Sequence, residues 1–142
     1  MQTICKTASL LAVAVLLTGC HDKSIVTIYD KSVTQKPVSC LSLRVIPDDM
    51  QIREKLETLY AFREQCKQRL EVTYKSQIVC NSAYNASQKA LSQFPDSYLN
   101  MEIRQGFTLQ YSYYIDLDHK PDVSDIEKGF ARIKSDLNFS AQ

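Results

Sequence analysis

The densest group of side chains with potential chemistry lies near the C-terminus. Asp116, Asp118, Asp122 and Asp125 surround His119 in the sequence. Carboxylate oxygens suit hard divalent cations, and a histidine beside a carboxylate can serve a hydrolytic triad. However, the residue order differs from that of a calcium loop, and no Gly-x-Ser-x-Gly motif presents a nucleophilic serine. We therefore expect a solvated loop that leads into a helix, with no catalytic residue, no bound metal and no cofactor.

A second chemically specific pattern ends at Cys20. Lys6 precedes an apolar run from Leu10 to Leu17, and Gly19 stands directly before Cys20. A positive start, an apolar run and a small-residue cleavage site are typical of a secretory signal. A cysteine directly after the small residues resembles the signal of bacterial lipoproteins. The resemblance implies a signal peptide over residues 1–19, cleavage before Cys20, and lipid, including palmitate, on the Cys20 sulfur.

This resemblance also implies a location. Several acyl chains hold a protein firmly at a membrane, whereas a single chain binds only marginally. The lipid on Cys20 is therefore expected to anchor the protein in the bacterial cell envelope, facing the periplasm. His21 follows in place of the aspartate that resembles an inner-membrane retention signal. That substitution favours the outer membrane, but the choice between the two membranes stays open.

Composition excludes several classes of ligand. Lys6 is the only one of the 17 Lys and Arg residues within residues 1–19, which contain none of the 16 Asp and Glu, so the mature chain has no formal net charge. Phosphate backbones require a basic patch, so nucleic acid is not expected as a ligand. Gly106 and Gly129 are the only glycines after the signal, which argues against a glycine-rich phosphate loop. We expect a protein partner and no small-molecule substrate.

The mature chain keeps Cys40, Cys66 and Cys80 in a compartment that favours disulfides. Cys66 and Cys80 are nearest in sequence, and their bridge would close a loop of about 15 residues, worth roughly 3 kcal/mol. Cys40 is the alternative partner for either one, because spacing alone does not choose. A zinc site needs clustered ligands, and His21 and His119 lie far from all three cysteines.

A single α+β domain is predicted over residues 38–142, after a lipidated N-terminus and polar tether over residues 20–37. Within the tether, Ile25–Tyr29 is rich in β-branched residues and suits a short strand. Apolar residues alternate with polar ones over residues 41–45, which predicts a half-buried strand that stops at Pro47.

Helical periodicity follows this strand. Asp48 and Asp49 suit the start of a helix, and apolar spacing predicts that it continues to near Val72–Tyr74, with Cys66 on its inner face. A second helix is expected from Asn81 or Ser82 to Pro95. The two helices would form a helical hairpin.

The clearest pattern is the two-residue alternation from Leu99 to Leu117. Because one strand of that length is too long for the domain, we expect two antiparallel strands that turn at Gly106. Ser124–Glu127 matches a capping box, and the apolar spacing after it predicts a final helix. The expected fold is α+β, a small antiparallel sheet with the helical hairpin and the C-terminal helix packed on one face.

Three tyrosines lie together in this alternating segment. Tyr111 and Tyr113 occupy apolar positions and are expected in the core, whereas Tyr114 has the opposite parity and is expected to face outwards. Tyrosine is enriched in protein interfaces because it buries a large ring and keeps a polar tip. Tyr114 is therefore the candidate interface residue.

Part of the chain resembles a known family. Leu59–Lys67, Cys80–Ala83 and Ala86–Ala90 match the layout of small exclusion lipoproteins of conjugative plasmids and integrative elements. In these proteins a lipid-bearing cysteine and a short tether precede a helix that ends in cysteine; a second cysteine, an asparagine and an alanine-rich helix follow. The similarity extends from Cys20 to about Ala90, and Cys40 is additional to the family layout.

The resemblance implies a function without catalysis. The lipid-held domain would bind a component of the donor's mating apparatus and prevent a cell from receiving a second copy of an element it already holds. The alternative is a pilotin-like or assembly lipoprotein of a secretion or conjugation apparatus. A third reading, an envelope hydrolase or metal-binding lipoprotein, would depend on His119 and its aspartates.

Overall fold

The computed structural model describes residues 23–79 and 95–140, which form a five-stranded sheet and three helices. The strand order is β1-β5-β4-β3-β2, with β2 parallel to β3 and every other neighbouring pair antiparallel. The chain is therefore α+β as expected, but its sheet is mixed and not purely antiparallel. The strands are β1 (Ile25–Ile28), β2 (Leu41–Ile46), β3 (Gln68–Lys75), β4 (Ser97–Gln105) and β5 (Thr108–Leu117). The helices are α1 (Ser32–Gln35), α2 (Met50–Leu59) and α4 (Val123–Asp136).

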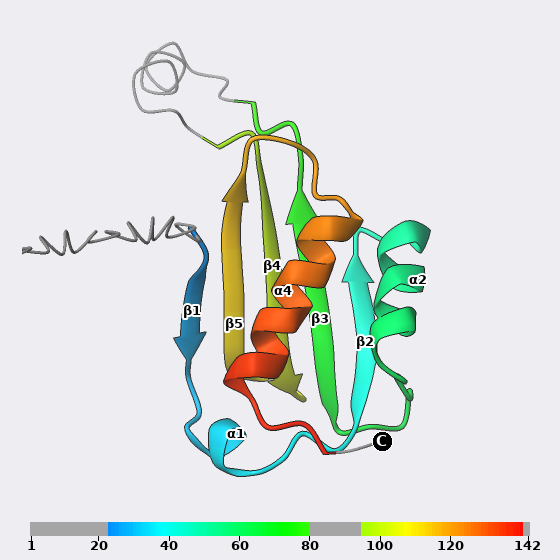
Figure 1. Cartoon of the computed structure of the whole chain (residues 1–142), viewed down its shortest axis with the longest axis vertical. Helices are drawn as coiled ribbons and strands as arrows, with labels where there is room; N and C mark the ends of the chain where they lie inside the picture. Colours follow the sequence, from blue (N-terminus) through cyan, green and yellow to red (C-terminus); the bar gives the residue numbers. More distant parts are fainter. Residues whose placement is uncertain (1–22, 80–94, 141–142) are drawn as a thin grey trace, which may run out of the picture.

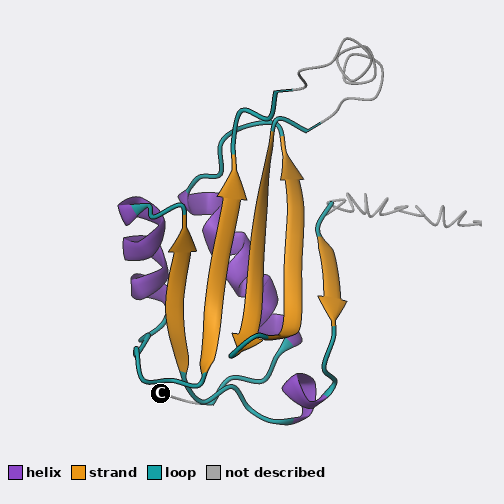
Figure 2. Ribbon diagram, turned by 180° about the vertical axis from the view of Figure 1, so that it is seen from behind, coloured by secondary structure: helices purple, strands orange, loops and turns teal. Residues whose placement is uncertain are grey.

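Helices α2 and α4 cover the same face of the sheet. In Figure 1, α4 crosses in front of the strands and α2 lies beside β2. Figure 2 shows the opposite face, with no helix of the described residues in front of it. The core lies between the sheet and the two helices, because apolar residues alternate towards this face along each central strand. Its fully buried members include Leu56, Leu70, Leu99, Met101, Ile103, Tyr111, Ile126, Phe130 and Ile133.

The C-terminal helix is confirmed, but it begins earlier than its expected cap. The Asp122 side chain accepts hydrogen bonds from the backbone N–H groups of Ser124 and Asp125, and the Asp125 side chain accepts one from the N–H of Asp122. The capping box is thus Asp122–Asp125 and not Ser124–Glu127. Two acidic side chains take the places of the serine and glutamate that the pattern specifies, so the predicted pair Ser124 and Glu127 is wrong.

The hairpin of β4 and β5 is confirmed, with Gly106 in its turn. Gly106 has a φ of +59°, a backbone conformation that glycine adopts without steric cost. The register between the two strands shifts by one residue, so that Ile103 pairs with Tyr111 but Arg104 pairs with Leu109. A β-bulge of this kind moves the following residues to the opposite face. Leu109 therefore shares the face of Arg104, although its parity placed it in the core.

The expected long helix is wrong beyond its first part. α2 begins after the predicted cap Asp49, whose side chain accepts from the N–H groups of Gln51 and Ile52, and it ends at Leu59. A loop follows, and residues 68–75 form β3. Leu70 fits helical spacing with Cys66, but Leu70 and Val72 also alternate with polar neighbours, and β-branched residues favour the strand. Because β3 separates α2 from residues 80–94, the predicted hairpin of consecutive helices is also wrong; its second arm lies outside the described residues.

Residues that the sequence analysis assigns to the tether pack on the sheet. Ile25–Ile28 forms β1, as its composition suggested, and pairs antiparallel with β5. Val33 in α1 is buried among the core residues, as is Val38, the first residue of the predicted domain. The polypeptide is thus folded from its first described residues onward.

Candidate functional site

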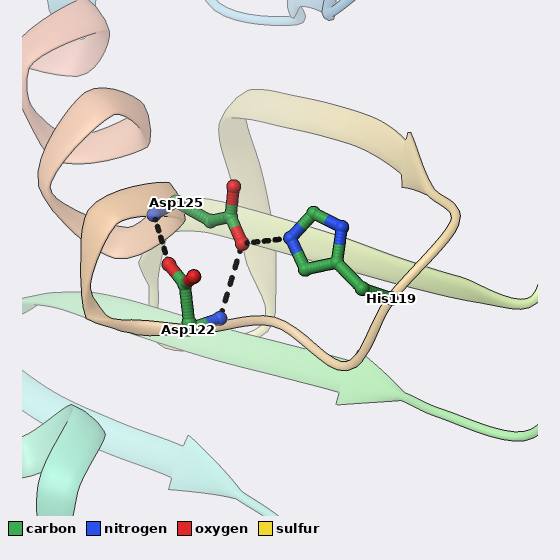
Figure 3. A group of neighbouring side chains, drawn as sticks. All are labelled: His119, Asp122 and Asp125. Carbon is green, nitrogen blue, oxygen red and sulfur yellow. Dashed lines mark hydrogen bonds and ion pairs between the residues drawn. The ribbon is translucent and has the colours of Figure 1, made fainter.

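The structure brings His119, in the loop that joins β5 to α4, between the carboxylates of Asp118 and Asp125. Figure 3 shows the contact with Asp125. The Nδ1 of His119 lies 2.7 Å from Asp118 Oδ1, and its Nε2 lies 2.9 Å from Asp125 Oδ2. The hydrogen bond to Asp118, followed by that to Asp125, raises the pKa of His119. The same contact with His119 lowers the pKa of Asp118. His119 therefore gains protons more readily than a free histidine and holds the loop against the start of α4.

The carboxylates around His119 serve the helix terminus. Asp122 Oδ1 lies 2.8 Å from Ser124 N and 3.0 Å from Asp125 N, and these bonds to backbone N–H groups lower the pKa of Asp122. Asp125 Oδ2 bonds both His119 and Asp122 N. Negative charge at a helix N-terminus is stabilised by the helix dipole. The arrangement therefore has a complete structural explanation.

The groups around His119 that could act as a base or as metal ligands are engaged with one another in the structure. Both ring nitrogens of His119 contact carboxylates, so neither is left to activate a serine. One ligand atom each of His119, Asp122 and Asp125 lies within 4.8 Å of the others, but the two carboxylates already accept the cap hydrogen bonds. Asp116, which the sequence grouped with this cluster, instead accepts a hydrogen bond from Tyr114.

A larger candidate is the sheet face opposite the helices, which we call the open face. Its members follow from the register, because residues directly paired across strands share a face. Ion pairs join the central members. Glu71 contacts Arg44, Arg69 and Arg104, and Arg69 is the nearest at 3.1 Å. Arg104 also lies 2.6 Å from Glu102. The polar and charged members of the open face on β2 to β5 are Ser42, Arg44, Arg69, Glu71, Thr73, Lys75, Tyr98, Asn100, Glu102, Arg104, Ser112, Tyr114 and Asp116. By the same register Ile25 and Thr27 of β1, Ile46 of β2 and Leu109 of β5 also lie on this face.

Tyr114 stands on this open face, half-buried beside a second tyrosine. Its ring stacks on Tyr98 with centroids 5.7 Å apart and an interplanar angle of 25°. Its hydroxyl donates to Asp116 Oδ1 at 2.8 Å. Burial, together with that bond, raises the pKa of Tyr114 to about 12. The phenol therefore stays neutral and its ring is fixed in orientation, which lowers the entropy lost when a partner binds.

Sequence reasoning correctly separated Tyr114 from Tyr111 and Tyr113, which are buried. It missed Tyr98 and the ion pairs of the open face. The signal that identifies Tyr98 is its parity with Asn100, together with an antiparallel register that pairs Asn100 with Tyr114. That register requires knowledge of the turn and of the bulge.

The disulfide joins Cys40 to Cys66, whose Cα atoms lie 5.5 Å apart. Cys66 is thus bonded to the alternative partner and not to Cys80, which lies outside the described residues. Parallel pairing explains the contact, since Leu41 pairs with Gln68 and the residues just before each strand meet. The predicted lipidation site, Cys20, also lies outside the described residues.

No protein-family model matches the chain, and no curated protein or solved structure shows significant similarity to it. Within residues 23–79 and 95–140, no helix is both long and apolar enough to cross a membrane.

Proposed function

We propose that this protein is a lipid-anchored protein of the bacterial envelope that acts by binding another protein through its open face. The observation that carries the proposal is the Tyr98–Tyr114 stack, held on a sheet face that no described helix covers. Interfaces are enriched in tyrosine and arginine, and both occur here on a rigid support.

The chemistry of the open face favours a folded protein over a small molecule. Its charged groups are paired internally, as Glu71 and Glu102 are by Arg69 and Arg104. Such a surface presents a fixed pattern of charge, which gives selectivity between related partners more than raw affinity. The tyrosine pair supplies apolar area near this pattern. A partner that is flat and complementary in charge fits both features.

We further propose that the partner belongs to a donor's mating apparatus and that the protein excludes redundant conjugative transfer. This step rests on the resemblance of residues 59–90 to exclusion lipoproteins. In the structure the helix of that layout ends at Leu59, and Cys66 lies in the following loop, bonded to Cys40. The layout is therefore shared in sequence but built differently, and genetics has to decide the role.

The test is to express the protein alone in a recipient and to measure the frequency of incoming transfer. We expect the wild type to lower that frequency and Tyr98→Ala/Tyr114→Ala to restore it. An interface anchor of this kind contributes about 2 kcal/mol, or roughly thirtyfold in affinity. Met50→Ala is the matched control, because Met50 is 72% exposed on α2, away from the open face. Equal amounts of folded, membrane-associated protein must be shown for each variant.

Each outcome has a distinct meaning. Unchanged transfer with the wild type would reject the exclusion role. Exclusion that persists in the double variant would reject the open face as the binding surface. If deletion of the gene from a donor instead abolishes outgoing transfer, the protein is an assembly lipoprotein, the alternative role for the same surface.

A further inference from the structure

Apolar side chains are exposed on both sides of the edge strand β1 and on the residue after it: by register Ile25 lies on the open-face side and Ile28 on the side of the helices. Ile25 is 60% exposed, Ile28 44% and Tyr29 59%. Edge strands of soluble domains usually avoid such a row, because it invites association. Figure 1 shows β1 and α1 at the edge of the sheet opposite α2. The row therefore lies at the far edge from β2 and its disulfide.

The backbone beneath this row is held firmly. The N–H groups of Tyr29 and Asp30 donate to the carbonyl of Gln110 at 2.9 and 3.2 Å. The Asp30 carboxylate accepts from Ser32 N at 2.8 Å, so it is turned towards the start of α1. The side chains of Ile28 and Tyr29 thus remain exposed although the main chain is fixed. A rigid apolar strip loses little entropy when a surface covers it.

Lysines outnumber acidic residues among the described residues that flank the strip, where Asp30 is the acidic residue. Lys23, Lys31 and Lys36 are exposed before and after β1. Lysines beside exposed apolar and aromatic residues are typical of segments that lie in a membrane interface, where the ammonium groups meet anionic headgroups. Tyrosine prefers the same zone because its ring is apolar and its tip polar.

The position of the strip in the chain indicates that a membrane covers it. Ile25 is five residues after Cys20, and five residues span at most about 18 Å. With lipid on Cys20, the start of β1 is therefore confined close to the bilayer. This step rests on the lipidation in the proposed function.

We propose that Ile25, Ile28 and Tyr29, with their flanking lysines, form a second membrane contact that lies on the headgroup region of the bilayer holding Cys20. β1 is then the membrane-proximal edge of the sheet, and β2 stands four strand spacings, about 19 Å, further out. The sheet rises from the membrane by its edge, so the open face is turned sideways, with Tyr114 one strand further out than the membrane contact at Ile25.

The absence of tryptophan from the sequence makes a direct test practical. Tyr29→Trp and Ile28→Trp each introduce a single emitter into the lipidated mature protein. The control is Met50→Trp, on α2 at the other edge of the sheet. Each protein is reconstituted into vesicles of phosphatidylethanolamine and phosphatidylglycerol, with and without lipids brominated near the headgroup. Intact mass verifies that each sample carries acyl chains.

We expect the emission of both β1 variants to shift to shorter wavelength on vesicles and to lose intensity with brominated lipid, whereas Met50→Trp shows neither change. Acylated β1 variants that are quenched no more than Met50→Trp would overturn the membrane contact and leave the anchor intact. A mass without acyl chains would instead reject the lipidation on which the proposal rests. The two failures are therefore distinguishable.

Discussion

Adjacent residues of this chain have opposite environments. Tyr113 is 3% exposed and packs under α4, whereas Tyr114 lies on the open face and bonds to Asp116. The cause is elementary, since successive side chains of a strand point to opposite sides. Parity alone was therefore enough to separate Tyr114 from its buried neighbours Tyr111 and Tyr113. It fails only where the strand is irregular, as at the bulge that displaces Leu109.

Gly129 is a position where a single methyl group decides stability. A Cβ atom there would lie 2.7 Å from Met101 Sδ and 3.0 Å from Tyr113 Cε1, and Met101 is fully buried. Alanine favours helices over glycine by about 1 kcal/mol, but overpacking a core costs about 1–3 kcal/mol. We expect Gly129→Ala to lower the free energy of unfolding by about 1 kcal/mol, measured by urea denaturation.

The matched control is Ser135→Ala on the exposed side of the same helix, where only helix propensity changes. This control is expected to be neutral or slightly stabilising. A Gly129→Ala protein as stable as Ser135→Ala would show that Met101 moves aside without cost.

At the scale of elements, prediction succeeded where local and long-range signals agree. α4 combines an apolar stripe with acidic residues at its start, and the alternation of β4 and β5 is interrupted at a glycine. The segment after α2 gave conflicting signals. Leu70 suits both a helical stripe and a strand, so spacing could not exclude a longer helix. Pairing with β2 and β4 on both sides decides in favour of the strand, and such tertiary pairing overrides local propensity.

The beginning of α4 is expected to respond to pH through His119. Its raised pKa means that its stabilising effect is complete below about 6.5, the ordinary histidine value, and is lost as pH rises through the raised pKa. The lowered pKa of Asp118 has the opposite pH dependence. Its contribution to stability is present above the usual aspartate pKa and is lost as pH falls through the lowered pKa. The helix start is therefore most stabilised in weakly acidic solution.

The measurement compares the free energy of unfolding of wild type and His119→Gln at about pH 5.5 and about pH 9. At the lower pH the wild type should be more stable than His119→Gln. The difference in the free energy of unfolding should be less than about 1 kcal/mol, because His119 is 49% exposed and water screens its charge. This difference should shrink at the higher pH. Lys128→Gln is the control, because it removes a positive charge from the same helix and leaves His119 in place. An equal variation with pH in both variants would contradict the role of His119.

For the molecule as a whole, the feature that sequence could not predict is the parallel pairing of β2 and β3. Helical spacing assigns Leu70 to a helix and so offers no strand there to pair with β2, and alternation reports the faces of a strand and not its direction. The crossover through α2 returns the chain to the end of the sheet where β2 began, and this places Cys66 beside Cys40. Proximity in sequence favoured Cys80, so the error in the disulfide follows from the error in topology.

This bridge is expected to stabilise the whole domain. It spans a sequence separation of 26 residues, and closing such a loop in the unfolded chain corresponds to about 3.5 kcal/mol. Because it joins the edge strand β2 to the loop before the more central β3, its loss should lower the single cooperative urea transition and not release β2 alone. Cys40→Ser/Cys66→Ser should therefore be less stable than wild type by about this amount.

Cys80→Ser is the matched control, because it removes the thiol of Cys80 and leaves both cysteines of the bridge in place. It should retain the stability of the oxidised wild type and yield a peptide that joins Cys40 to Cys66 under non-reducing digestion. If Cys80→Ser instead loses stability and frees the thiol of Cys66, the pairing is Cys66–Cys80. The residues that precede β2 and β3 would then not be linked covalently. The hydrogen-bonded register of the two strands would still place Cys40 and Cys66 side by side.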